Sequence, residues 1–306
     1  MTIASEPAND QASRAAGIWA WVLNFLKYGA NSDPNDPKVW FFRHPLFVRI
    51  THWTNVVVLT VMLMSGLQIF NAHSALYWGY QSDFEHPWVS MTAQQNDDGS
   101  LKGVTKIGPW HFNTTGWLGA SKVGGQWAVR GFPSWATIPG PQWLAMGRLW
   151  HFFFAWLFVA NGVIFASLAV YSGHFARDLR PKESDITGLP AEIAHHVKLQ
   201  FPKGDAAKSY NGIQRLTYFT VIFIIAPLIV LTGLTMSPTL DAAFPFLPWL
   251  FGGRQSARTI HFLCAFSFVL FFIVHIVMVV LSGTWNNFRS MITGRYEIEQ
   301  PGGRHG

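Results

Sequence analysis

Four long apolar segments constrain the fold of this chain more than any other feature. They cover residues 47–70, 143–171, 216–236 and 259–281. About 20 apolar residues are enough for a helix to cross a bilayer, and each segment reaches that length. Only 12% of the residues are charged, whereas soluble domains carry about 25%. We therefore predict an all-α integral membrane protein, a four-helix bundle with a large Trp-rich outer loop between its first two helices.

The segments divide the 306 residues into a membrane domain with shorter ends. We expect an N-terminal segment 1–42, a transmembrane domain 43–290 with an outer loop 71–142 and a cytoplasmic loop 172–215, and a cytoplasmic tail 291–306. Residues 17–26 are apolar but too short to span, which fits an interfacial helix or a helix packed on the bundle equally well. No internal repeat is apparent.

Basic residues outside the four segments predict the orientation. Counted through Arg49 and Arg148 at the starts of the first two segments, the N-terminal side, the loop 172–215 and the residues after 281 hold 15 Lys and Arg, against 7 in the other two loops. Because basic residues favour the cytoplasmic side, we expect both termini in the cytoplasm. The net charge of +6 is explained by this clustering beside apolar spans and anionic headgroups, so nucleic acid is not an expected partner.

The loop 71–142 contains six tryptophans, and disordered segments are poor in aromatic residues. We expect a folded cap on the outer face of the membrane. Two roles are equally open for it: binding a partner protein, or packing on itself as a lid over the outer end of the bundle.

Four histidines lie inside the apolar segments: His52, His151, His261 and His275. His261 and His275 are separated by about 21 Å along one helix and by about 40° around it. With the predicted orientation, His151 and His261 lie at the outer depth, and His52 and His275 at the cytoplasmic depth. Ionisable groups in a span are costly and mark functional sites. Each pair could fill both axial positions of one b-type haem iron, a ligation that suits electron transfer.

Arginines and glycines repeat around these histidines. Arg49, Arg148 and Arg258 each precede a histidine by three residues, one helical turn nearer to water, where they could pair with haem propionates. The alternative is that they only set topology. Gly66 and Gly162 lie on the faces of His52 and His151 at the depth of the other haem, where glycine allows close approach; ordinary small-residue packing is equally open. The single cysteine, Cys264, excludes a Cys-x-x-Cys-His site for covalent haem.

The chain resembles the dihaem cytochrome b subunits of bacterial respiratory oxidoreductases, of the cytochrome b561 and nickel–iron hydrogenase type. The strings RHPLFVRITHWTN, MSGLQIFNAHSALYWG and YNGIQRLTYFTVIFIIAPLIVLTGLTMSP are most similar to the thiosulfate reductase cytochrome b branch. The resemblance implies a four-helix bundle in the bacterial inner membrane that holds two non-covalent b haems on His52, His151, His261 and His275. It also implies ubiquinone or menaquinone as electron partner near the cytoplasmic haem, and a catalytic partner subunit, often a molybdopterin enzyme.

For the quinone site we expect polar side chains at the cytoplasmic rim: His174, Asn211, Gln214 and Arg215. The leading hypothesis is an electron-transfer subunit that connects a periplasmic redox enzyme with the quinone pool. One alternative is a stand-alone quinone-linked haem oxidoreductase that oxidises superoxide or reduces ferric iron. A transporter whose histidines relay protons is the least favoured, because it needs neither paired depths nor a repeated Arg-x-x-His.

Overall fold

The computed structural model describes residues 8–28, 38–97, 99–140, 142–200 and 207–299. The chain forms two compact units. The first comprises Met1–Ile50, Leu168–Phe219 and Val269–Gly306, and the second comprises Thr51–Ser167 and Thr220–Phe268. The long helices pass from one unit into the other, so each unit contains segments that are far apart in the sequence.

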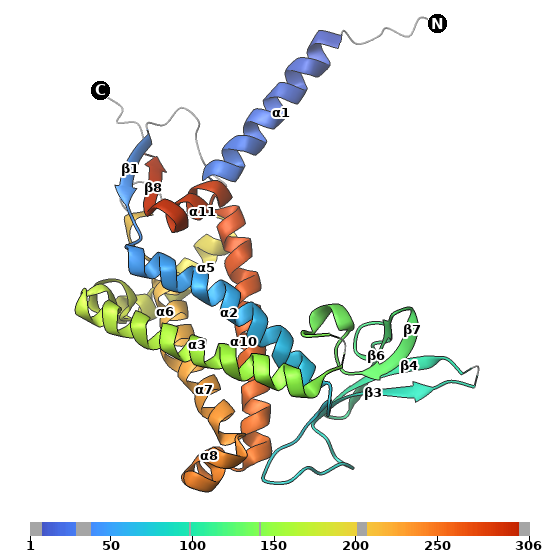
Figure 1. The fold of residues 1–306 in the computed structure, drawn as a ribbon. Coiled ribbons are helices and arrows are strands. Elements are labelled where there is room, and N and C mark those ends of the chain that lie inside the picture. Colours follow the sequence, from blue (N-terminus) through green and yellow to red (C-terminus); the bar gives the residue numbers. More distant parts are fainter. Residues whose placement is uncertain (1–7, 29–37, 98, 141, 201–206, 300–306) are drawn as a thin grey trace, which may run out of the picture. The chain divides into compact units, whose positions relative to one another are not determined.

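Among the residues that the structure describes, four helical segments are long and apolar enough to cross a membrane. They are α2 (Leu46–Phe70), α3 (Leu144–Tyr171), the continuous run Gly212–Thr235, and α10 (Arg254–Leu281). Each coincides with one of the predicted apolar segments, which confirms the prediction of an integral membrane protein with four candidate spans (Figure 1).

The third candidate span is not a regular α-helix throughout. It consists of α6 (Gly212–Thr220), a π-helical turn η4 (Val221–Ile225) and α7 (Ala226–Thr235). Pro227, the second residue after the π-helical turn, has no backbone N–H to give to an α-helical bond. A π-turn accommodates one extra residue within a helix, so this span contains one residue more than a regular helix of the same length.

The prediction of an all-α chain is wrong for the loop between α2 and α3. This loop forms an antiparallel sheet in the order β2-β3-β4-β5 and a separate hairpin β6-β7; β3, β4, β6 and β7 are labelled in Figure 1. The strands are β2 (Ala75–Leu76), β3 (Val89–Gln95), β4 (Leu101–Ile107), β5 (Trp110–Asn113), β6 (Gly119–Val123) and β7 (Gln126–Arg130). A short helix η1 (Ser134–Ala136) follows them.

Glycine turns explain why this loop folds as strands. In the β6-β7 hairpin Val123 pairs with Gln126, and the two residues between them, Gly124 and Gly125, have φ of 57° and 85°. Positive φ at both central residues is the geometry of the two-residue hairpin turn that matches strand twist. The loop therefore uses its glycines to reverse the chain and its aromatic and β-branched residues to build strands.

Two apolar clusters form the core of the second unit. One joins Phe70 at the end of α2 to Leu76, Val89, Met91 and Phe132 of the following loop. The other brings together Val58, Phe158, Ile229 and Cys264, one residue from each of the four span segments. The four segments of this unit thus pack as a bundle, with the loop attached to the end of α2.

The first unit also contains helices and strands that are shorter than the four candidate spans. Its helices are α1 (Ala8–Tyr28), α4 (Glu183–Thr187), α5 (Leu189–Val197), α11 (Thr284–Thr293) and the π-helical η2 (Phe175–Leu179), and β1 (Lys38–Phe42) pairs antiparallel with β8 (Arg295–Glu299). Helices α8 (Pro238–Ala243) and α9 (Phe246–Leu250) belong to the second unit. α1 contacts α11, and its Trp19 and Trp21 are exposed. At Ala8–Tyr28 it is longer at both ends than the predicted residues 17–26.

Candidate haem site

The imidazole rings of His151 on α3 and His261 on α10 lie beside each other in the second unit. Their ring centroids are 6.2 Å apart, and the ring planes meet at 65°. Two metal–imidazole bonds of about 2.0 Å, plus about 1 Å from each nitrogen to its ring centre, give a separation of about 6 Å. The two rings therefore have the spacing that axial ligation of one metal ion between them requires.

Hydrogen bonds fix the tautomer of both rings. Nδ1 of His151 lies 3.0 Å from the carbonyl oxygen of Met62 on α2, and Nδ1 of His261 lies 2.9 Å from that of Ile229 on α7. A carbonyl oxygen only accepts, so each Nδ1 carries the proton and donates it. Each Nε2 then keeps its lone pair, which is the form in which histidine binds a metal, oriented by a bond from its other nitrogen.

A hydroxyl group supports each of these bonds. The Ser65 and Thr232 hydroxyl oxygens each lie 3.2 Å from the Nδ1 of His151 and His261, respectively. Each hydroxyl donates to its own helix, Ser65 to the Val61 carbonyl oxygen at 2.7 Å and Thr232 to that of Leu228 at 2.8 Å. The oxygen lone pairs are thus left to accept from Nδ1–H, and the imidazoles are held from two directions.

Glycine makes room for each imidazole. A Cβ atom placed on Gly66 would lie 3.2 Å from Cε1 of His151, and one placed on Gly233 would lie 3.3 Å from Cε1 of His261. Both distances are below an ordinary carbon–carbon contact. Sequence reasoning identified Gly66 but missed Ser65, Thr232 and Gly233, although the Ser-Gly and Thr-Gly pairs at matching places in two spans were visible.

Comparison with known proteins gives the chemistry of such a site. The model of the prokaryotic cytochrome b561 family matches residues 114–294. The chain belongs to this family. It is also 27% identical over 240 residues to a protein of Azospira oryzae named "Putative protein-methionine-sulfoxide reductase subunit YedZ1", covering 78% of this chain and 90% of that relative. No solved structure matches the chain.

Membership of the cytochrome b561 family implies that the chain binds haem b. The donor set around His151 and His261 fits this group: two neutral imidazoles at ligating distance, each oriented by a backbone carbonyl. The protein is therefore a cytochrome b561-type membrane haem protein.

The other two predicted ligands occupy different units of this cytochrome. His52 lies on α2 in the second unit, and His275 lies on α10 in the first. The ring of Phe271, one turn before His275, stacks on it with centroids 5.7 Å apart and planes at 22°. The pairing of His52 with His275 remains a prediction from their depths along the helices.

The three predicted propionate partners have different surroundings. Arg258 donates a short hydrogen bond to the backbone carbonyl of His73 and lies over the ring of Phe70. Arg49 donates a short bond to the Ile292 carbonyl. Arg148 is exposed and lies over the Phe152 ring, 5.6 Å from its centroid. Of the predicted glycines, Gly162 has open space where its Cβ would be.

The loop between α2 and α3 attaches to the helix that carries His261. Thr259 donates to the Tyr77 carbonyl oxygen at 2.6 Å, and the Ser256 hydroxyl accepts from the amide of Gly79 at 2.7 Å. His73 lies next to them, with Nε2 3.0 Å from the Tyr77 hydroxyl. Burial, and then the charge of Arg258, lower the pKa of His73. The first turns of α10 are thus held by backbone groups of His73, Tyr77 and Gly79 in the loop.

A second group of buried polar and aromatic side chains lies in the first unit. His174, which is buried, places Nδ1 2.7 Å from an oxygen of Asp178. Its ring lies 6.5 Å from that of Tyr210, which lies 5.2 Å from that of Tyr218. Burial is the main cause that raises the pKa of Tyr210, so this phenol stays protonated at neutral pH. Of the predicted quinone residues, only His174 belongs to this group.

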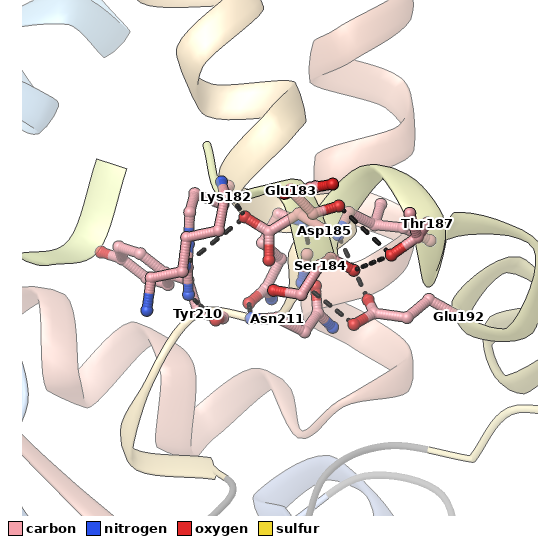
Figure 2. Close-up of polar contacts among 12 residues, drawn as sticks. Lys182, Glu183, Ser184, Asp185, Thr187, Glu192, Tyr210 and Asn211 are labelled. Atoms are coloured by element: carbon pink, nitrogen blue, oxygen red, sulfur yellow. Dashed lines mark hydrogen bonds and ion pairs between the residues drawn. The ribbon is translucent and has the colours of Figure 1, made fainter. Parts of the chain in front are cut away.

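The remaining predicted quinone residues cap α6. The Gln214 amide donates to Oδ1 of Asn211 at 2.9 Å, and the Asn211 amide donates to Oε1 of Gln214 at 3.3 Å, which is a reciprocal capping box. The carboxylate of Glu192 accepts from the next amides (Figure 2). Arg215 is buried and forms an ion pair with Asp185, in which Nη1 lies 3.4 Å from Oδ2. Its Nη2 donates to the backbone carbonyl of Tyr210. These contacts favour a structural role for the three residues.

Proposed function

We propose that this protein is the dihaem cytochrome b subunit of a respiratory oxidoreductase, and that it carries electrons across the bacterial inner membrane. The observation that carries the proposal is the His151–His261 pair, with ring centroids 6.2 Å apart and each Nδ1 bonded to a backbone carbonyl. With both axial positions filled by imidazole, the iron of a b haem transfers electrons rather than binding a substrate.

The proposal includes a second haem on His52 and His275. Fourteen residues separate His261 from His275, so one helix reaches two depths on nearly one face. Two haems at two depths would connect the two membrane surfaces. The count of basic residues supports cytoplasmic termini, with the His151–His261 haem on the periplasmic side.

At the cytoplasmic side we propose exchange with quinone of the ubiquinone or menaquinone type. The His174–Asp178 pair and Tyr210 supply groups that can accept or donate protons there. Quinol oxidation releases two protons together with two electrons, so a proton acceptor at the site is a chemical requirement.

The proposed partner is a periplasmic oxidoreductase subunit. The relative from Azospira oryzae is named as a subunit of a protein-methionine-sulfoxide reductase, and we extend that class of partner to this chain in preference to a thiosulfate reductase. Molybdopterin in the partner is part of the proposal and is checked by the molybdenum content of a co-purified subunit. We propose that the folded loop between α2 and α3 binds this partner; its attachment to the start of α10, the helix that carries His261, supports this role.

The test uses the purified full chain with bound haem. A short-chain quinol should reduce both haems without any second subunit, and subsequent oxidation by a sulfoxide should require the partner. A chain that reduces ferric iron or oxidises superoxide at a full turnover rate by itself would support a stand-alone oxidoreductase instead. A purified chain without a Soret band after haem supplementation would contradict both.

A further inference from the structure

The two halves of the bundle share a sequence pattern. On the second span of each half, Arg148-x-x-His151 is followed by Phe and, three residues further, by Ala; Arg258-x-x-His261 is followed by the same residues. On the first span, the string MLMSGL ending at Leu67 matches IVLTGL ending at Leu234. The chain therefore contains a repeat, which revises the expectation that it has none.

The structure shows the repeat independently of the sequence. Equivalent residues of the two halves meet each other: His151 meets His261 with centroids 6.2 Å apart, and Phe158 meets Phe268 at the same distance. Each histidine also contacts its own half in the same way, through a carbonyl, a hydroxyl and a glycine at three positions of equal spacing. Such contacts between equivalent residues are the signature of an approximate two-fold axis.

The repeat also relates the beginnings of the first spans, but with a shift of one residue. The string RITHWT from Arg49 matches RLTYFT from Arg215, an offset of 166 residues. The Ser-Gly and Thr-Gly pairs are offset by 167 residues. The π-helical turn Val221–Ile225 lies between the two matches and accommodates the extra residue. With this correction Tyr218 is the equivalent of His52.

The symmetry is therefore kept at the His151–His261 depth and lost at the other depth. His52 and His275 have Tyr218 and Phe165 as their equivalents, and neither of these is a usual axial ligand of a b haem. The repeat thus predicts, at the His275 depth, a second place that resembles a haem-ligand position but carries a phenol instead of an imidazole.

An aromatic series connects Tyr218 to a haem ligand and to a proton acceptor. Phe271 stacks on His275 at 5.7 Å and lies 6.4 Å from the ring of Tyr218. Tyr210 lies 5.2 Å from Tyr218 and 6.5 Å from His174. All five residues belong to the first unit. The predicted haem ligand His275 is at one end of this series, and the His174–Asp178 pair is at the other end.

We propose that Tyr218, Tyr210 and the His174–Asp178 pair bind the quinone headgroup, and that the site arose at the haem-like position that Tyr218 occupies. The proposal rests on the proposed quinone-linked function and assigns its residues. The phenols donate hydrogen bonds to the quinone oxygens. Asp178 accepts from Nδ1–H of His174, which leaves Nε2 to accept a proton.

The two O–H bonds of the quinol break, and the product is quinone, two protons and two electrons. Nε2 of His174 accepts each proton in turn and releases it to water, and the Asp178 carboxylate stabilises the imidazolium in the meantime. A haem held by His275 would take up the two electrons one at a time, and the oxidised partner subunit would be their final acceptor.

The experiment compares Tyr218→Phe and Asp178→Asn with the wild-type chain, each purified with bound haem. Tyr171→Phe is the matched control, because Tyr171 at the end of α3 is 91% exposed. Haem reduction by decylubiquinol and by a short-chain menaquinol is compared with reduction by dithionite. The quinone that co-purifies with each chain is extracted and quantified.

Both variants should keep the dithionite-reduced spectrum of the wild type, while reduction by quinol slows at least about tenfold and co-purified quinone falls several-fold; the control should match the wild type. Wild-type rates and quinone content in both variants would overturn this assignment while leaving the proposed function intact. A wild-type chain that neither quinol reduces would overturn the proposed function itself. Tyr218→Phe could fail by losing haem. In that case the quinol reduction rate and quinone content of two other variants decide: Asp178→Asn, and Tyr218→His, which introduces the residue type found at the equivalent position 52.

Discussion

A methyl group added at Gly66 or Gly233 tests the ligand geometry of the His151–His261 pair most sharply. The new Cβ would lie 3.2 Å from Cε1 of His151 in Gly66→Ala, and 3.3 Å from Cε1 of His261 in Gly233→Ala. A relaxed carbon–carbon contact is about 3.5–4.0 Å, so each imidazole must move by about 0.2–0.8 Å. Metal–ligand distances tolerate only about 0.2 Å. We therefore expect each substitution to weaken one axial bond.

The assay is the absorption and EPR spectrum of the purified cytochrome, with a redox titration of each haem. Gly66→Ala and Gly233→Ala should shift only one of the two haems toward five-coordinate, high-spin iron, or lose part of it, and leave the other unchanged. Gly17→Ala is the matched control, since Gly17 lies on α1 outside the spans and its Cβ would meet nothing within 4 Å. Spectra of all three variants that equal the wild-type spectrum would refute the reasoning that these glycines make room for the ligands.

Three further predictions concern the surroundings of the site. Ser65→Ala and Thr232→Val each remove a hydroxyl that lies 3.2 Å from Nδ1 of His151 or His261, which makes that imidazole a weaker electron donor to the iron. In a redox titration, the potential of the haem bound by this pair should rise by about 20–60 mV. An unchanged potential would contradict the role of the hydroxyls. Because the pKa of His73 is lowered in the folded chain, its protonation favours unfolding, and thermal stability should fall as pH drops below about 6.5. His73→Gln should lessen that fall. A pH profile of the melting temperature identical to that of the wild type would exclude His73 as its cause. Asp185→Asn leaves Arg215 buried without its partner, at a cost of about 3 kcal/mol, which should appear as a lower melting temperature than in the exposed control Asp83→Asn.

The sequence predicted the four spans and the candidate ligands because both depend on strong local signals. A run of more than 20 apolar residues has few other structures open to it, and an imidazole inside such a run is rare enough to stand out. The loop between α2 and α3 gave weaker signals: its strands, such as Trp110–Asn113, are short, and their patterning is interrupted by glycines. That is why the sheets were missed.

The supporting residues were missed for a different reason. Ser65 and Thr232 bond to carbonyls of their own helices, as serine and threonine often do within spans, so their presence alone indicates no partner. Only the contact with His151 or His261 distinguishes them. In contrast, the capping box of Asn211 and Gln214 follows a known pattern of spacing and could have been predicted in place of a quinone role.

The most direct test of the account is the haem content of the purified chain and of four variants in which one ligand histidine is replaced by alanine. A pyridine haemochrome assay should give two b haems per wild-type chain and one per variant. His151→Ala and His261→Ala should retain the same haem, with one potential, and His52→Ala and His275→Ala should retain the other. One haem per wild-type chain, or a retained haem that differs within either pair, would contradict the account.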